Sequence, residues 1–399
     1  MSLNSVPAAE RIHIGFYGKR NAGKSSLVNA VTSQSLAIVS DVPGTTTDPV
    51  TKTMELLPIG PVVIIDTPGI DDEGELGKLR VEKSYQALNK TNIAIIVVDS
   101  STGIEAEERA LIGKIKEKNI PYIVAYSKSD VAKAAPAAEN EICVSSETGE
   151  NINELKELIG KLAAAPTNER HIISDKLEPG DFVVLVVPVD KAAPKGRLIL
   201  PQQQTIRDIL DAHAMCAVTQ DDSLKETLAA LSVKPKFVIT DSQVFGKVSK
   251  DTPEEISLTS FSILFANYKG NLRLAVESVK ALDCLEDGDP VLIAEGCTHH
   301  RQCGDIGTVK LPALIKRYTG KTPEFTWTSG TEFKDDLTKY KLVIHCGGCM
   351  LNVAEMQSRL KSAERQGVPI TNYGTAIAYM NGILKRSLSP FPEIQQIIS

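Results

Sequence analysis

Three short stretches of this 399-residue chain combine residue types that bind phosphate and metals. Residues 18–25 read Gly-Lys-Arg-Asn-Ala-Gly-Lys-Ser, which fits the phosphate-binding pattern G-x-x-x-x-G-K-S/T. Later in the chain, Cys297-Thr298-His299 and Cys346-Gly347-Gly348-Cys349 offer thiols and an imidazole, which are ligands for iron and zinc. The first stretch predicts a nucleotide site, and the other two predict a metal or redox site.

The phosphate-binding pattern lies between a predicted strand, residues 12–17, and a predicted helix, residues 25–30. That context supports the motif, because its glycines let backbone N–H groups curl around phosphate oxygens at a helix N-terminus. We expect Lys24 to reach the β- and γ-phosphates and Ser25 to bind Mg²⁺.

Three further motifs follow in the order found in guanine-nucleotide sites. Asp66-Thr67-Pro68-Gly69 follows a predicted strand and offers a carboxylate for Mg²⁺ and a glycine for the γ-phosphate. The loop before it, residues 43–48, contains Thr46, which can cap the metal. Asp130, in the stretch Ser127-Lys128-Ser129-Asp130, can accept two hydrogen bonds that guanine donates and adenine does not. Together the motifs predict GTP in preference to ATP.

The candidate nucleotide-binding residues all lie in these motifs or directly beside them: Gly18, Asn21, Ala22, Gly23, Lys24, Ser25, Ser26, Thr46, Asp66, Gly69, Ser127, Lys128, Asp130, Ser145 and Ser146. Among them, the predicted catalytic residues are Lys24, Thr46, Asp66 and Gly69. The predicted Mg²⁺ ligands are Ser25 and Thr46.

The cysteine motifs each follow a short apolar run, residues 291–294 and 342–344. Ligands gather at the carboxyl ends of strands in open α/β sheets, so the motifs are expected to meet. A helix from about Met350 is expected to lower the thiol pKa values there. The ligand types alone allow three readings: an iron–sulfur cluster on three cysteines, a zinc site completed by His299, or a redox pair that needs only Cys346 and Cys349. His345 either lines this site or packs in the core.

The order of elements predicts an α/β protein. Short β-branched runs alternate with amphipathic stretches up to about residue 165, which is typical of a mostly parallel, helix-covered sheet. We predict a P-loop domain over residues 1–168 and two smaller α/β domains over 169–266 and 267–399. Further strands are expected at 237–240 and 261–265, and a helix at 205–214.

Composition limits the class of protein. Hydrophobic residues make up 42% and charged residues 24%, as in globular proteins, and the net charge of −6 disfavours nucleic-acid binding. The apolar runs are shorter than a membrane span, and the start lacks the apolar core of a signal peptide. We therefore expect a cytoplasmic protein without a membrane or nucleic-acid partner.

The first 160 or so residues resemble the Era and TrmE branch of GTPases, on the strength of all the motifs above in order. Two residues depart from that pattern: Ser127 stands where an Asn is usual, and Ile70 where Ras-like proteins place a water-orienting Gln. Without that Gln, intrinsic hydrolysis is expected to be slow or to depend on another group. The resemblance implies that Asn21 helps to bind K⁺ in place of an arginine finger; the alternative is that Asn21 only braces the loop.

A GTPase domain followed by C-x-H and C-G-G-C resembles the HydF family of [FeFe]-hydrogenase maturation GTPases over essentially the whole chain. The resemblance implies a [4Fe-4S] cluster on Cys297, Cys346 and Cys349, with His299 as fourth ligand or as a hydrogen-bond donor near the cluster. It further implies a scaffold that carries the diiron subcluster precursor to the apo-hydrogenase. The implied partners are that apo-enzyme, the two radical-SAM maturases and a second copy of the chain, joined through the middle domain.

Overall fold

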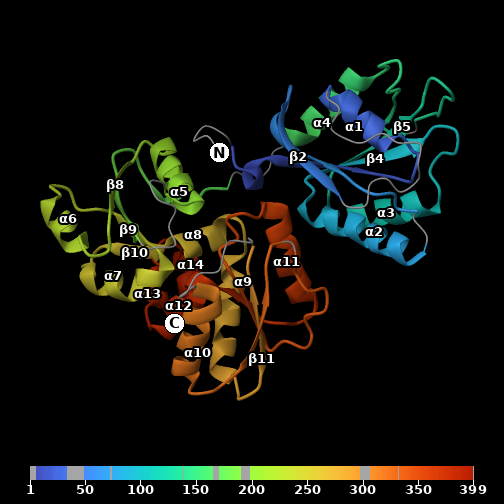
Figure 1. Cartoon of the computed structure of the whole chain (residues 1–399). Helices are drawn as coiled ribbons and strands as arrows, with labels where there is room; N and C mark the ends of the chain where they lie inside the picture. Colours follow the sequence, from blue (N-terminus) through green and yellow to red (C-terminus); the bar gives the residue numbers. More distant parts are fainter. Residues whose placement is uncertain are drawn as a thin grey trace. The chain divides into compact units, whose positions relative to one another are not determined.

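A computed structural model describes residues 6–33, 49–71, 74–136, 138–164, 170–189, 198–296, 306–330 and 332–398. The chain divides into two compact units, Met1–Glu169 and Arg170–Ser399 (Figure 1). Both units are α/β, which confirms the predicted fold class. None of the helices in the described ranges is both long and apolar enough to cross a membrane.

The first unit is built on one sheet. In the described residues its strands lie in the order β2-β3-β1-β4-β5-β6, and all neighbours are parallel except β2 and β3. The strands are β1 (Ile12–Tyr17), β2 (Val50–Leu56), β3 (Gly60–Asp66), β4 (Ile93–Asp99), β5 (Tyr122–Ser127) and β6 (Glu141–Cys143). The central strands are almost continuously apolar because helices cover both faces of a parallel sheet.

Two separate cores lie on the two faces of this sheet. One joins Leu27 of α1 and Leu155 of α4 to strand residues, and the other joins Leu111 of α3 to the opposite side chains of the same strands. The helices are η1 (Ala8–Glu10), α1 (Lys24–Thr32), α2 (Gly74–Ala87), η2 (Leu88–Lys90), α3 (Ala106–Glu117) and α4 (Ile152–Ala163). The parallel register pairs Phe16 with Asp66, so the ends of β1 and β3 meet at one edge of the sheet.

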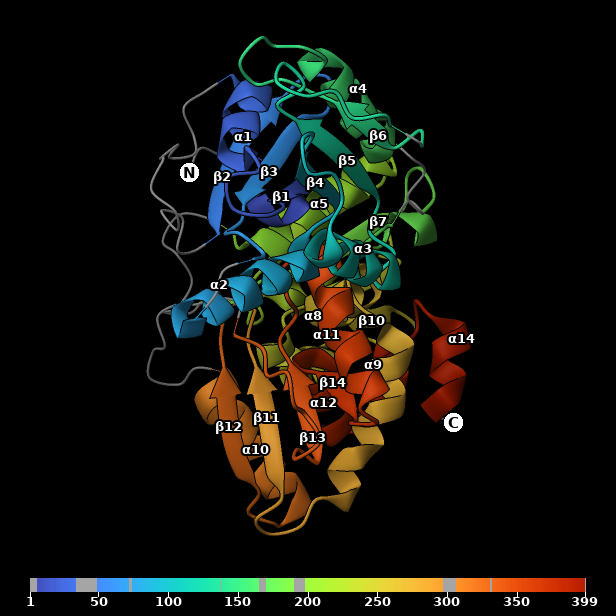
Figure 2. The ribbon, with the colours of Figure 1, turned by 90° about the vertical axis from the view of Figure 1, so that its right-hand side faces the viewer.

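The second unit contains two sheets of parallel strands. In the described residues one has the order β10-β9-β7-β8 and the other β12-β11-β13-β14, whose arrows run side by side in Figure 2. The first consists of β7 (Phe182–Val186), β8 (Met215–Thr219), β9 (Phe237–Thr240) and β10 (Ser257–Ser260). The second consists of β11 (Pro290–Ala294), β12 (Glu324–Thr328), β13 (Leu342–His345) and β14 (Ile370–Asn372).

The two sheets of the second unit share a core. One cluster of buried apolar residues extends from Ile172 to Ile394 and includes residues of both sheets. The helices around it are η3 (Ser174–Lys176), α5 (Leu200–Asp211), α6 (Leu224–Ala230), η4 (Ser242–Val244), α7 (Phe245–Asp251), α8 (Phe261–Tyr268), α9 (Leu272–Ser278), η5 (Val279–Cys284), η6 (Ile306–Lys310), α10 (Leu311–Thr319), α11 (Val353–Arg365), α12 (Tyr373–Met380), α13 (Leu384–Ser387), α14 (Pro392–Gln395) and η7 (Gln396–Ile398). The division of this second unit into a middle and a C-terminal domain stays a prediction.

One expectation about this unit was wrong, and another had the wrong bounds. Residues 261–265, predicted as a strand, begin α8, because the Ser260 hydroxyl accepts a hydrogen bond from the amide of Ile263 and caps the helix. The apolar run alone did not distinguish a buried strand from a buried helix. The helix predicted over 205–214 is α5, which begins earlier, at Leu200, and ends at Asp211.

Candidate functional site

The phosphate-binding loop connects β1 to α1 at the carboxyl edge of the first sheet. Gly18 has φ +149°, and a Cβ there would lie 2.2 Å from the carbonyl oxygen of Val97. Gly23, at φ +85°, precedes the first residue of α1. Both positions therefore require glycine, and the loop leaves the α1 N-terminus available to an anion.

Lys24 lies inside this loop. Its side chain is buried, and its Nζ donates to the backbone oxygens of Gly18, at 2.9 Å, and Lys19. These carbonyls hold the ammonium group at the loop, where the sequence predicts contact with phosphates.

Ser25, a predicted Mg²⁺ ligand, contacts Asp66, the carboxylate that is also expected to hold Mg²⁺. The Ser25 hydroxyl donates to Asp66 Oδ2 at 2.9 Å, and within the described ranges Asp66 Oδ1 is buried without a hydrogen-bond partner. Burial raises the pKa of Asp66, while the Ser25 hydrogen bond and the Lys24 charge lower it. A buried carboxylate oxygen without a partner fits a divalent cation, whose preferred ligands are oxygens.

The segment after Asp66 contacts the phosphate-binding loop directly. The amide of Ile70 donates to the Gly18 carbonyl at 3.2 Å, and the Arg20 amide donates to the Asp71 carboxylate at 2.7 Å. A Cβ on Gly69 would lie 2.6 Å from the Arg20 side chain, so the close approach requires glycine. These contacts join the segment after Asp66 to the phosphate-binding loop.

The base-recognition motif follows β5. The Ser127 hydroxyl donates to the Ala22 carbonyl at 2.6 Å and so braces the phosphate-binding loop. Lys128 pairs with Asp99 at 2.6 Å. Asp130 is exposed, and its carboxylate accepts a hydrogen bond from the Ser145 hydroxyl. The loop containing Ser145 thus orients the carboxylate that is predicted to recognise guanine.

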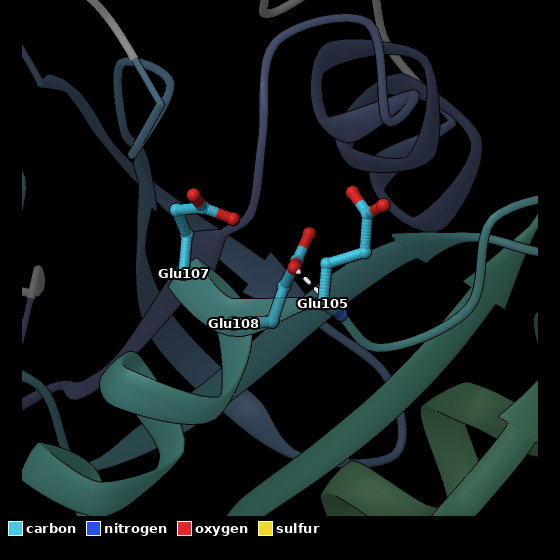
Figure 3. Close-up of side chains that lie close together, drawn as sticks. All are labelled: Glu105, Glu107 and Glu108. Carbon is cyan, nitrogen blue, oxygen red and sulfur yellow. Dashed lines mark hydrogen bonds between the residues drawn. The ribbon is translucent and has the colours of Figure 1, made fainter.

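Three carboxylates lie together at the start of α3 (Figure 3). Their ligand atoms lie within 4.8 Å of one another, as in a metal site, and they belong to Glu105, Glu107 and Glu108. The ammonium group of Lys19 lies where a metal ion would sit, with Nζ 2.7 Å from the Glu107 carboxylate and 3.9 Å from that of Glu108. The cluster therefore links the phosphate-binding loop to α3. Nothing in the sequence patterns pointed to this contact.

The Cys346-Gly347-Gly348-Cys349 segment, called the CGGC loop below, follows β13. Gly348 has φ +62°, which lets the loop turn tightly. The sulfur of Cys346 accepts hydrogen bonds from the amides of Gly296, at 3.0 Å, and Gly348, at 3.4 Å. Because β11 pairs with β13, Gly296, the residue before Cys297, lies against Cys346.

The expected effect of a helix on these thiols is wrong for Cys349. The helix α11 begins only at Val353, and its N-terminus is capped by the Asn352 side chain. Burial raises the pKa of the Cys349 thiol, while the ammonium charge of Lys269 lowers it. Desolvation therefore outweighs the positive charge near this thiol.

His345 is fully buried beside the CGGC loop. Arg359 donates to its Nε2 at 3.1 Å, so its Nδ1 carries the proton and donates to the Cys346 carbonyl at 2.8 Å. Burial and the Arg359 charge lower the pKa of His345 to about 3, so the ring is neutral. Arg359 is itself paired with Glu355 at 2.6 Å. His345 therefore supports the loop backbone, a role that its position next to a cysteine did not reveal.

Several predicted site residues lie outside the described residues: Thr46, Cys297 and His299. The other candidates lie at the two edges already described. Asn21, at φ +57°, is exposed in the phosphate-binding loop, Ser26 lies in the first turn of α1, and Ser146 follows Ser145.

Family models match three consecutive parts of the chain. The model described as a 50S ribosome-binding GTPase matches residues 13–128. The hydrogen maturase F dimerization domain matches residues 172–270, and the hydrogen maturase F tetramerization domain matches residues 273–390. The two hydrogen maturase F models together match more than half of the chain. The chain belongs to the HydF family.

The GTPase domain of this HydF chain is also similar to that of other GTPases. The tRNA modification GTPase MnmE of Desulforamulus reducens is 41% identical over 117 residues, 29% of this chain and 25% of that protein. MnmE of Chromobacterium violaceum is 33% identical over 161 residues, 38% of this chain and 35% of that protein. The chain thus spans well under half the length of these curated relatives.

Parts of solved structures also match the chain. A crystal structure of Aquifex aeolicus Era bound to GDP and aluminium fluoride is 21% identical, with a TM-score of 0.35; the match covers 52% of this chain and 93% of that one.

Proposed function

We propose that this HydF-family chain hydrolyses GTP and uses a [4Fe-4S] cluster as the platform for a second metal fragment. The fragment is the diiron subcluster precursor, which the chain passes to apo-[FeFe]-hydrogenase. Its suppliers are the two radical-SAM maturases. Family membership supports this cargo and these partners.

The first unit supports GTP hydrolysis. The phosphate-binding loop, the Asp66 carboxylate with one unpartnered buried oxygen and the Asp130 carboxylate held by Ser145 are the three parts that such a site needs. In this proposal Ser25, Thr46 and Asp66 hold Mg²⁺, directly or through water, and Gly69 contacts the γ-phosphate. Asn21 helps to bind K⁺, which supplies the positive charge that no arginine finger provides.

The observation that carries the cluster proposal is the environment of Cys346. Its sulfur accepts hydrogen bonds from two backbone N–H groups, those of Gly296 and Gly348. Such hydrogen bonds stabilise a thiolate ligand and adjust the reduction potential of a cluster. Cys349 lies on the same tight loop, and Cys297 follows Gly296 in the chain. The donor set of soft thiolates fits an iron–sulfur cluster.

Three cysteine ligands would leave one iron of the cluster without a cysteine. That position can bind a bridging group from a second metal fragment, which suits a carrier. His299 is the residue proposed to occupy or to border it. Arg359 and His345 keep the CGGC loop in place by fixing the Cys346 carbonyl.

The middle part of the chain supports a homodimer. Residues 172–270 match a dimerization domain, and in the described residues β8 lies at one end of the order β10-β9-β7-β8. Met215 and Val218 of β8 are each 47% exposed. An edge strand with exposed apolar side chains is a surface on which another chain can pack. We propose that two copies meet along β8.

Metal analysis tests the cluster proposal. The full chain is purified without oxygen and analysed for iron, zinc and acid-labile sulfide, and the reduced protein is examined by EPR. We expect about four irons and four sulfides per chain in a [4Fe-4S] protein. Cys346→Ser and Cys349→Ser should lose the cluster, whereas Cys216→Ser, which changes a cysteine on β8, should retain it.

Stoichiometric zinc without sulfide in the wild-type chain would contradict the proposal. It would favour a regulatory GTPase with a structural zinc site, the alternative that the ligand types allow. Cysteines that cycle between thiol and disulfide, with no bound metal, would favour the redox alternative.

A further inference from the structure

We infer that Lys269 supplies a buried positive charge to the cysteine site and raises the reduction potential of the cluster bound there. The inference rests on the proposed function, because it concerns the cluster that Cys346 and Cys349 would hold. Lys269 lies between α8 and α9, outside both cysteine motifs. It follows the dimerization-domain helix α8, whereas the cysteines lie in the range matched by the tetramerization domain.

The ammonium group of Lys269 contacts the end of the CGGC loop. Its Nζ donates to the carbonyl oxygen of Cys349 at 3.2 Å and to that of Leu351 at 3.1 Å. It also lies 5.9 Å from the centre of the Phe265 ring. The residue is 0% exposed, although lysine side chains usually extend their charged ends into water.

The backbone of Lys269 is held by the helix that follows the CGGC loop. Gln357 of α11 donates its side-chain amide to the carbonyl of Lys269 at 3.2 Å and to that of Gly270 at 2.8 Å. Both ends of Lys269 are therefore attached to the segment that carries Cys349. The position of the charge is fixed relative to the cysteine.

A buried ammonium group is costly unless negative charge lies near it. A cluster held by cysteine thiolates would add negative charge near this ammonium group. A fixed cation stabilises the reduced cluster, which carries one more negative charge, more than the oxidised cluster. Lys269 is thus a positioning residue whose charge, rather than its packing alone, acts on the cluster.

The test compares the reduction potential of the wild-type chain with that of Lys269→Met. Both full-length proteins are loaded with iron and sulfide and titrated with dithionite under EPR observation. We expect Lys269→Met to bind as much iron as the wild type. Its ratio of reduced to oxidised cluster at a fixed potential should fall about tenfold, which corresponds to about 59 mV for a one-electron couple.

A matched control removes a lysine elsewhere in the same unit. Lys310 is exposed, and its Nζ donates to the Gln243 side chain at 3.3 Å. Lys310→Met should leave the potential unchanged. A comparable shift in that variant would show that net charge alone moves the potential, which would overturn the inference.

Each remaining outcome of the experiment also tests the inference. A loaded Lys269→Met protein with the wild-type potential overturns the inference alone, and so does a loss of iron with an unchanged potential, since that result assigns a structural role. A wild-type chain without iron and sulfide overturns the cluster proposal and this inference together. If Lys269→Met does not fold, Gln357→Leu keeps the charge but frees the Lys269 backbone. We expect Gln357→Leu to lower the ratio of reduced to oxidised cluster by less than tenfold. An unchanged ratio in this variant would overturn the inference.

Discussion

At the scale of single residues, Ser127 is the clearest departure from a standard guanine site. Its hydroxyl reaches the Ala22 carbonyl and the Val98 carbonyl, so it braces the phosphate-binding loop. The side chain is short, and both of these contacts point to protein backbone. An Asn at this position offers an additional amide for the base.

We predict that Ser127→Asn binds GDP roughly fivefold more tightly, because one added hydrogen bond contributes about 1 kcal/mol. The affinity is measured by titration with a fluorescent GDP analogue. Ser129→Asn is the control, since Ser129 donates to Glu150 and is not the residue that braces the loop. Equal or weaker affinity in Ser127→Asn would show that the loop brace is the main role of this serine.

A buried histidine makes the first unit sensitive to acid. Burial and the nearby Lys90 charge lower the pKa of His13 to about 4, although its hydrogen bond to the Arg11 carbonyl raises it. Below pH 6.5 the unfolded chain takes up a proton that the folded chain refuses. The contribution of neutral His13 to the stability of the folded chain is therefore fully present above pH 6.5, and it is lost as the pH falls toward 4.

We predict that His13 alone removes on the order of 3 kcal/mol of stability between pH 6.5 and pH 4. His13→Asn should reduce this pH dependence. Urea unfolding, followed by hydrogen exchange of peptides from β1 and β3, measures it. His345 lies in the second unit, so peptides from β13 should keep their own acid sensitivity in the variant. An unchanged pH profile for β1 in His13→Asn would contradict the prediction.

At the scale of elements, β8 is the strand on which the proposed dimer depends. Val218→Lys adds a charge to its exposed apolar surface and should weaken dimer association at least tenfold, or about 1.4 kcal/mol. Sedimentation velocity over a dilution series measures the change. Val233→Lys is the matched control, because Val233 is equally apolar, is 53% exposed and lies outside the strands. Similar dissociation in both variants would place the interface elsewhere.

The sequence patterns predicted the strands that form distinct apolar runs, because β-branched runs of this length are typical of buried strands. They missed β2, whose side chains are mostly exposed and polar, and also β8, β10, β12 and β14. They also misassigned α8, because an apolar run buried on all sides has no period. The signal that could have corrected it was Ser260, a helix-capping residue directly before the run.

At the scale of the whole molecule, the nucleotide site and the cysteine site belong to different compact units. We predict that Lys24→Ala lowers GTP hydrolysis about a hundredfold or more, because it removes the cation that is proposed to contact the transferred phosphate. Its iron content should equal that of the wild type. Phosphate release and iron per chain are measured on the same preparation. Loss of iron would contradict the separate action of the two units.

Motif spacing predicted candidate residues for each site, but it did not predict the contacts that hold the described ones in place. The phosphate-binding loop and the CGGC loop were both expected at strand ends. Lys269, which lies 80 positions before Cys349, and Arg359, which reaches His345 from the helix α11, were not expected to contact this region. Such contacts depend on tertiary packing, which spacing within a motif does not record.

The hydrogen bond between Gly296 and Cys346 joins residues 50 positions apart, and it exists only because β11 pairs with β13. Parallel pairing closes a long loop and is a slow step in folding. We therefore expect the contact between Gly296 and Cys346 to form only once this sheet has assembled, and any metal site built on it to depend on that sheet.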